Sequence, residues 1–401
     1  MNNRRKEKPP VWLGWIGDMS TITQFLLEKP WGSPWCLLKA ANSILRAIGI
    51  VAFTNNPVSG VLILAAMVVG NMNVAWACLL AGGVGVLFAK ILKQPEQQIS
   101  DGVVVMNEIL VGCISVAAFP AISGHTLTTI FWFYLTLALI ITAYIDKGLN
   151  SLMAPSKLPA LSIPFNIAAV VMLLSMRSAA GLTGTRLPDL PSNTPPLLAS
   201  INSTEEIQWL KVMEGTLLAA GQIYGVGSID SSILIYLGFL LFSPLFTIFM
   251  FMGSIIGTVI GAMLSAAPYT DAYIGLWGYN AMLTAGGISF FMVPTPGVVL
   301  AAVVGAILAA TVQAASLHIF NTMTVPVLSY PFNVATLLIL AIGVTTNSPF
   351  PWVADKTFPE HHVFLYIRSL RAQNAEAITQ DPEDQGKPLK ILTAEDNHLT
   401  Y

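Results

Sequence analysis

Charged residues are scarce in this chain. Asp, Glu, Lys and Arg make up 10% of its 401 residues, whereas an ordinary soluble domain carries about 25%. Hydrophobic residues make up 54%. Because so little charge does not suit a conventional water-facing surface, the composition indicates a protein embedded in a lipid bilayer.

An excess of either sign of charge is also lacking. The 19 Lys and Arg residues are balanced by 21 Asp and Glu residues. The basic residues form no continuous patch, so the chain lacks the positive surface that attracts a nucleic acid backbone. We therefore expect no nucleic acid partner.

Cysteine is rare. Cys36, Cys78 and Cys113 stand singly in or beside apolar stretches, without the paired spacing of a zinc site or a disulfide framework. Isolated cysteines of this kind usually pack as small buried hydrophobes. We expect no metal site and no cofactor.

Motifs of enzymes and energised pumps are missing. The sequence contains no GxxxxGK[ST] phosphate loop, no HExxH pair and no GxSxG elbow. No series of Asp, Glu and His recurs at helical spacing, as a proton relay would require. We predict that the protein is not an enzyme and contains a neutral, uncoupled permeation path. Such a path needs pore width, hydrogen-bonding oxygens and apolar walls.

Long apolar stretches fill the chain on either side of a polar interval at 183–206. Several reach the roughly 20 residues that a helix needs to cross a bilayer. The interval is rich in proline and contains Asn202-Ser203-Thr204, an acceptor pattern for N-glycosylation. It therefore predicts an extracellular loop with Asn202 as the glycosylated residue. The basic start and the tail with Arg368 and Arg371 belong in the cytoplasm by the positive-inside rule.

The two apolar regions are copies of one another. Leu158–Ala168 reads LPALSIPFNIA, and Val325–Ala335, 167 residues later, reads VPVLSYPFNVA. Asn107–Gly112 (NEILVG) similarly matches Asn280–Ala285 (NAMLTA). Repeats of this length indicate two domain-sized halves, because solenoid units are much shorter.

The predicted topology makes the second half inverted. With both termini inside and the middle loop outside, each half crosses the membrane an odd number of times. Five transmembrane helices plus a membrane-entering helix per half fit the hydropathy. We therefore predict an all-α polytopic membrane protein of two inverted-topology halves with a central pore in each protomer. The expected parts are a cytoplasmic segment at 1–30, a first transmembrane repeat at 31–182, the extracellular loop at 183–206, a second transmembrane repeat at 207–351 and a cytoplasmic tail at 352–401.

Several motifs together resemble the urea transporter family. They are NNPVSG at Asn55–Gly60, the two LPxLSxPFN-like segments, GQIYG at Gly221–Gly225 and GYNAML at Gly278–Leu283. The resemblance extends from about Trp31 to Pro351. It implies a plasma-membrane homotrimer in which each protomer passes urea, or a similar small neutral solute, passively down its gradient.

The resemblance also implies roles for individual residues. A second-half urea site would use Gln222 as hydrogen-bond acceptor with Ile223 beside it, and Tyr279 and Leu283 as the walls of a slot. The matching first-half positions are Ile50, Val51 and Phe53, with Met106 and Leu110 as the slot. Ser162 and Ser329 would form the barrier between the two sites, where the family commonly has threonine.

Three first-half residues depart from the family pattern. Ile50 stands where Gln is usual, Met106 replaces an aromatic residue, and Glu108 replaces a small one. An ionisable residue inside a membrane is a functional candidate by default, so Glu108 joins the candidate site.

These departures leave an alternative open, in which the same fold carries ammonia, methylamine, another small amide or amine, or water. A non-transporting scaffold or receptor would need an enlarged soluble domain, and a coupled transporter would need an ion-binding cluster. The sequence shows neither.

Overall fold

A computed structural model describes residues 17–178, 206–353 and 355–380. This part of the chain consists of helices joined by short connections, and it contains no β-strand beyond one isolated bridge between Met292 and Trp352. Helical segments long and apolar enough to span a bilayer are Met72–Ile91, Val103–Ser123, Thr129–Ser156, Pro244–Leu264 and Pro296–Met323. The prediction of an all-α polytopic membrane protein is confirmed.

The two halves present the same helices in the same order. The first half contains α2 (Cys36–Ile50), α3 (Pro57–Gly70), α4 (Met72–Ile91), α5 (Glu96–Ser100), α6 (Met106–Ser123), α7 (Thr129–Met153) and α8 (Ile163–Ser178). Their counterparts are α9 (Trp209–Gln222), α10 (Ile229–Phe242), α11 (Pro244–Leu264), α12 (Thr270–Tyr273), α13 (Gly278–Phe291), α14 (Pro296–Met323) and α15 (Tyr330–Gly343). Additional elements are α1 (Ser20–Leu27), the short 3₁₀ turns η2 (Val103–Val105) and η3 (Ala154–Ser156), and α16 (Pro359–Gln380).

Polar caps set the helix starts of both halves. Asn56 Oδ1 accepts from Val58 N at 2.8 Å and Ser59 N at 3.2 Å, so the NNP motif begins α3 with a proline at its first position. A single extended residue, Asn71, then separates α3 from α4 and caps the second helix. Ser243 does the same between α10 and α11. Each half therefore has a corner between two helices that follow each other directly.

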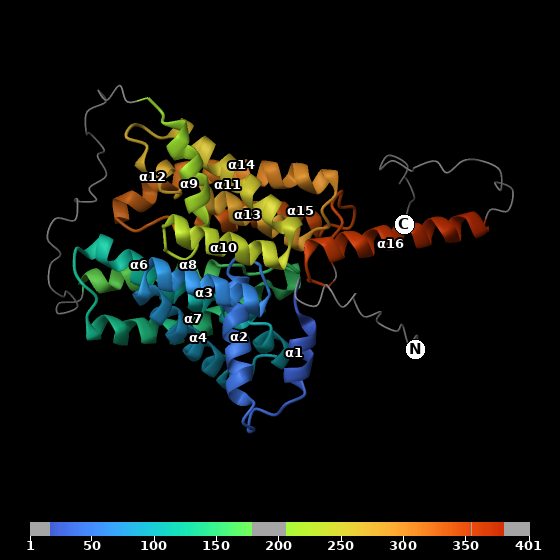
Figure 1. Ribbon diagram of the computed structural model, residues 1–401, viewed down its shortest axis with the longest axis horizontal. Coiled ribbons are helices and arrows are strands. Elements are labelled where there is room, and N and C mark those ends of the chain that lie inside the picture. The colour runs from blue at the N-terminus through green and yellow to red at the C-terminus, as the bar shows by residue number, and fades with distance from the viewer. Residues whose placement is uncertain (1–16, 179–205, 354, 381–401) are drawn as a thin grey trace.

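The halves meet along α3 and α10. Figure 1 shows the first half in blue to green below the second half in yellow to orange, with these two helices along the seam. Ser59 Oγ donates to Gly238 O at 2.7 Å, and Ser231 Oγ donates to Ala66 O at 2.8 Å. Small residues on both helices let the backbones come close enough for these bonds.

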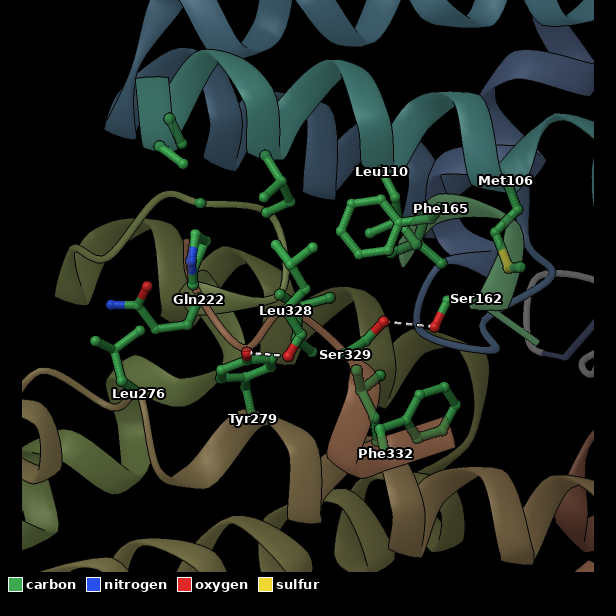
Figure 2. Close-up of a pocket in the computed structure, with 18 of the residues that line it drawn as sticks. Met106, Leu110, Ser162, Phe165, Gln222, Leu276, Tyr279, Leu328, Ser329 and Phe332 are labelled. Carbon is green, nitrogen blue, oxygen red and sulfur yellow. Dashed lines mark hydrogen bonds between the residues drawn. The ribbon is translucent and has the colours of Figure 1, made fainter. Parts of the chain in front are cut away.

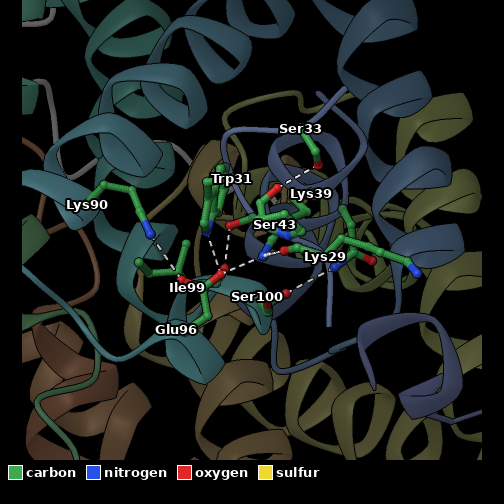
Figure 3. Close-up of polar contacts among 11 residues, drawn as sticks. Lys29, Trp31, Ser33, Lys39, Ser43, Lys90, Glu96, Ile99 and Ser100 are labelled. Atoms are coloured by element: carbon green, nitrogen blue, oxygen red, sulfur yellow. Dashed lines mark hydrogen bonds and ion pairs between the residues drawn. The ribbon is translucent and has the colours of Figure 1, made fainter. Parts of the chain in front are cut away.

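A polar cluster anchors the N-terminal elements to the first half. Trp31 Nε1 donates to Glu96 at 2.5 Å, and the Lys39 and Lys90 ammonium groups lie 4.9 and 4.8 Å from the Trp31 ring. Both lysines also pair with Glu96, at 2.8 and 3.1 Å (Figure 3). Lys39 Nζ additionally donates to Lys29 O at 2.8 Å. The cluster joins α2, α4 and α5 to the segment that follows α1.

A buried arginine holds the segment before α1. The Arg46 guanidinium donates to the carbonyls of Asp18, Met19 and Asn55, at 2.7, 3.0 and 2.9 Å. Asn56 Nδ2 donates to Gly17 O at 2.8 Å beside it. The NNP motif therefore both begins α3 and binds the residues preceding α1.

Candidate functional site

A cavity of about 340 Å³ lies between the two halves (Figure 2). α6 and the start of α8 line it from the first half, and the end of α9, the start of α13 and the start of α15 line it from the second. Equivalent elements of the two copies therefore face each other across one space. This is the arrangement expected where inverted or duplicated halves share a substrate path.

Most of the residues predicted from the sequence lie on this cavity. The lining includes Gln222, Ile223, Tyr279 and Leu283 from the second half, Val51, Phe53, Met106 and Leu110 from the first half, and Ser162 and Ser329. Ile50 and Glu108 do not line it. Ile50, the last residue of α2, is buried in the protein interior with 7% of its surface exposed.

Helix geometry explains why Glu108 lies off the cavity. Met106 and Leu110 are four residues apart and share the cavity face of α6, whereas Glu108 lies about 200° around the helix from Met106. It is fully buried, and an added Cβ on Gly85 of α4 would lie 3.5 Å from the Glu108 Cβ. Both of its carboxyl oxygens lack a hydrogen-bond partner among the described residues.

The end of α9 orients Gln222. Its amide nitrogen donates to Ile274 O at 2.7 Å. This bond engages Nε2, which leaves Oε1 as the atom of the amide that accepts hydrogen bonds. Gly227 provides the room for this pose, because an added Cβ there would lie 2.6 Å from Gln222 Nε2. Gly225, three residues after Gln222, has a φ of +72°. An added Cβ at Gly225 would lie 2.5 Å from the Ala117 side chain of α6.

Two leucines in left-handed conformation place carbonyl groups in equivalent positions. Leu161 and Leu328 have φ of +50° and +55°, a conformation that costs ~1–2 kcal/mol for a residue with a Cβ. Asn107 Nδ2 donates to Leu161 O at 3.3 Å, and Asn280 Nδ2 donates to Leu328 O at 3.2 Å. The Tyr279 hydroxyl also donates to Leu328 O. The same strained turn therefore occurs in the cavity wall of both halves.

Helices behind the wall hold the two asparagines. Asn107 Nδ2 donates to Asp146 Oδ1 of α7 at 2.8 Å, and Asn280 Nδ2 donates to Gln313 Oε1 of α14 at 2.9 Å. Met106, at the position equivalent to Tyr279, has no hydroxyl group. Leu161 O therefore accepts one hydrogen bond fewer than Leu328 O.

The serines meet in the middle of the cavity. Ser162 Oγ and Ser329 Oγ are 2.6 Å apart and hydrogen-bonded to each other. Figure 2 shows this pair between Gln222 and Leu276 on one side and Met106 on the other. Apart from these polar groups the lining is mainly apolar, so the cavity combines apolar walls with a few acceptor oxygens.

Sequence reasoning missed some lining residues for which a signal was present. Phe165 and Phe332 are the aromatic residues of the two PFN motifs, and both lie on the cavity beside the serines. Their repetition in the two halves was visible in the sequence. Ala117 and Ala118 of α6 also line the cavity, but alanines in an apolar helix carry no such signal. No group of three or more His, Cys, Asp or Glu suited to a metal occurs among the described residues.

Comparison with known proteins places these features in one family. The family model described as "Urea transporter" matches residues 41–344. Urea transporter 1 of Capra hircus is 32% identical over 383 residues, which is 91% of this chain and 92% of the relative. The Ovis aries protein of the same name gives the same figures. Urea transporter 1 of Rattus norvegicus is 30% identical over 372 residues, 90% of this chain and 91% of the relative.

Proposed function

Because the chain belongs to the urea transporter family, we propose that it passes urea across the membrane, passively and down its gradient, through the cavity between its halves. The observation that carries this proposal is the position of Gln222, Ser162 and Ser329 on one mainly apolar cavity. The protein is a transporter and not an enzyme.

The chemistry of the cavity suits urea. A flat molecule fits between apolar walls such as those formed by Leu110, Leu283 and Phe332. Its NH2 groups donate to Gln222 Oε1 and the serine oxygens, which replaces part of the hydration lost on entry. A cation meets no carboxylate on the lining, so its much larger desolvation cost is not compensated. Several weak sites in series allow both entry and exit.

The two urea sites differ in this chain. The second-half site has a complete set of acceptor and slot walls in Gln222, Ile223, Tyr279 and Leu283. The first-half site consists of Val51, Phe53, Met106 and Leu110, in which a flexible thioether replaces a flat ring. The alternative of an amine or other small solute was based on Ile50, Met106 and Glu108, and of these three residues only Met106 lines the cavity. Urea remains the solute that the site supports best.

The membrane arrangement follows as part of the same proposal. We place the protein in the plasma membrane as a homotrimer with both termini in the cytoplasm. The two transmembrane repeats at 31–182 and 207–351 have opposite orientation, and the loop at 183–206 is extracellular. Asn202, the proposed glycosylation site, lies outside the described residues.

Flux through reconstituted protein tests the function. Purified protein in liposomes is exposed to inward gradients of urea, methylamine and glycerol, and entry is followed by stopped-flow light scattering. We expect rapid urea entry that Gln222→Ala lowers about tenfold, because a hydrogen-bond acceptor is removed from the path. Gln98→Ala is the control, since Gln98 is exposed and off the cavity. Methylamine entry without urea entry would contradict the proposal.

A further inference from the structure

Two asparagines bind the serine pair from outside the cavity. Asn166 Nδ2 donates to Ser162 O and to Ser329 Oγ, both at 2.8 Å. Asn333 Nδ2 donates to Ser329 O at 2.8 Å and to Ser162 Oγ at 3.0 Å. Each amide therefore binds the carbonyl four residues earlier and the hydroxyl of the opposite half. Neither asparagine lines the cavity, so both act on it through the serines.

The hydrogen bonds determine which hydroxyl donates. If Ser329 donates to Ser162 Oγ, the Ser162 hydrogen goes to Asn333 Oδ1 at 3.3 Å, and every N–H and O–H hydrogen of the four side chains has an acceptor. In the opposite order the Ser329 hydrogen has no acceptor in the network, because Asn166 Oδ1 makes no hydrogen bond. The first order is therefore favoured, since it gives every donor of the network an acceptor within the protein.

With Ser329 donating to Ser162, the serine pair offers the cavity a hydrogen-bond acceptor and no hydrogen-bond donor. Ser162 Oγ accepts from Asn333 and Ser329, which uses both of its lone pairs. Ser329 Oγ accepts from Asn166 at 2.8 Å, whereas Asn333 is at 3.5 Å. One lone pair of Ser329 Oγ therefore remains for a solute in the cavity.

We infer that Asn166 and Asn333 are positioning residues that make the serine pair a hydrogen-bond acceptor and so select solutes that carry N–H donors. The inference rests on the proposed function, because it concerns the path taken by urea. Urea offers four N–H hydrogens to such a site. A solute with acceptors alone, such as dimethyl sulfoxide, finds no donor at the serine pair.

A double-mutant cycle between Asn166 and Ser329 separates positioning from a purely structural role. Asn166 is preferred to Asn333, because Asn333 Oδ1 also accepts from the Ser162 backbone N at 3.1 Å. Asn166→Leu removes the amide at similar size. It is measured in the natural chain and in Ser329→Ala by stopped-flow light scattering of proteoliposomes with urea and with dimethyl sulfoxide. Asn73→Leu is the matched control, since Asn73 is exposed and off the cavity.

We expect Asn166→Leu to lower urea permeability about tenfold in the natural chain and less than about twofold in Ser329→Ala, where no hydroxyl remains to be positioned. The ratio of dimethyl sulfoxide to urea permeability should rise in Asn166→Leu, because the Ser329 hydroxyl loses the bond that fixes its oxygen and can turn its hydrogen toward the cavity. Ser329→Thr keeps the hydroxyl and should restore the full effect of Asn166→Leu. Asn166→Asp, which keeps the size of the side chain but cannot donate when ionised, repeats the cycle if the leucine variant does not fold.

Equal losses in the natural and Ser329→Ala backgrounds would overturn the inference, because Asn166 would then act through its bond to Ser162 O. An unchanged permeability ratio would overturn the selection of donors. Both results leave the proposed function intact when the natural chain conducts urea. A natural chain without urea flux would overturn the proposed function and the inference together.

Discussion

Gln222 is held through one atom of its amide group. Nε2 binds Ile274 O, and Gly227 leaves the space beside it. An added methyl group at Gly227 would meet the far end of a flexible side chain, so the fold can adapt by moving the amide. The position of the acceptor is therefore more sensitive to this change than the stability of the protein.

We expect Gly227→Ala to lower urea permeability about tenfold with little change in the melting temperature, because it displaces Gln222 and leaves the backbone in place. Permeability is measured in proteoliposomes, and melting by tryptophan fluorescence in detergent. Gly83→Ala is the control, since an added Cβ at Gly83 meets nothing within 4 Å. Unchanged urea flux in Gly227→Ala would show that Gln222 does not need this pose.

The sequence predicted the position of some site residues relative to the cavity better than that of others. Met106 and Leu110 follow from motif position and share a helix face, so the sequence placed them on the cavity. Glu108 was included because a carboxylate in an apolar run is unusual. Its direction depends on the rotation of α6 about its axis, which packing against α4 and α7 determines. Once Met106 and Leu110 are assigned to the cavity, however, helix periodicity places Glu108 about 200° away from it.

Short polar elements connect the long helices and bear much of the charge. Around α5, Glu96 accepts from Trp31, Lys39 and Lys90, and Lys39 is almost fully buried (Figure 3). Partial burial tends to raise the pKa of Glu96, but the hydrogen bonds from Lys39, Lys90 and Trp31 outweigh burial and hold the pKa below its ordinary value of 4.5. The cluster is therefore strongest with Glu96 ionised.

The lowered pKa of Glu96 predicts a pH dependence of stability. A carboxyl group with a depressed pKa stabilises the fold above its unfolded-state pKa and loses this contribution as pH falls through its folded-state pKa. We expect Glu96→Gln to melt at a lower temperature than the natural chain at pH 7, and the difference to shrink as pH falls below about 4. Melting is followed in detergent from pH 3 to 8. Glu28→Gln, at an exposed position, is the control, and a difference independent of pH would contradict the prediction.

At the level of elements, several helices begin where the sequence carries a capping residue or a proline. Asn56 and the repeated LPxLSxPFN-like segments marked the start of α3 and the turns before α8 and α15. The corner at Ser243 was harder to see, because a single extended residue between apolar helices barely interrupts the hydropathy.

Segments from both ends of the chain meet at the corner between α10 and α11. Gly17 N donates to Phe242 O at 3.0 Å, and the Phe242 and Phe358 rings are 6.4 Å apart. Glu360 of α16 accepts from Ser243 Oγ at 2.6 Å and from Leu245 N at 2.8 Å. α16 itself extends away from the bundle in Figure 1. The duplication predicted the two halves, whereas these contacts have no counterpart in the repeat and depend on tertiary packing.

In the whole molecule, the seam between α3 and α10 that joins the halves lies apart from the cavity that the solute enters. Ser59 and Ser231 bond across α3 and α10, and neither lines the cavity. We expect the double variant Ser59→Ala with Ser231→Ala to lose roughly 1 kcal/mol of stability, since side-chain hydrogen bonds between membrane helices average about 0.6 kcal/mol each. Urea permeability per folded protein should stay within about twofold of the natural chain, because the cavity residues are unchanged.

Thermal unfolding in detergent and stopped-flow urea entry measure these two quantities on the same preparation. Ser369→Ala is the control, because Ser369 is exposed on α16 and bonds only within its own helix. A loss of permeability with unchanged melting would place the α3 and α10 seam in the solute path. Reduced stability with preserved flux would instead show that cross-half bonds hold the two copies together while the residues between them determine permeation.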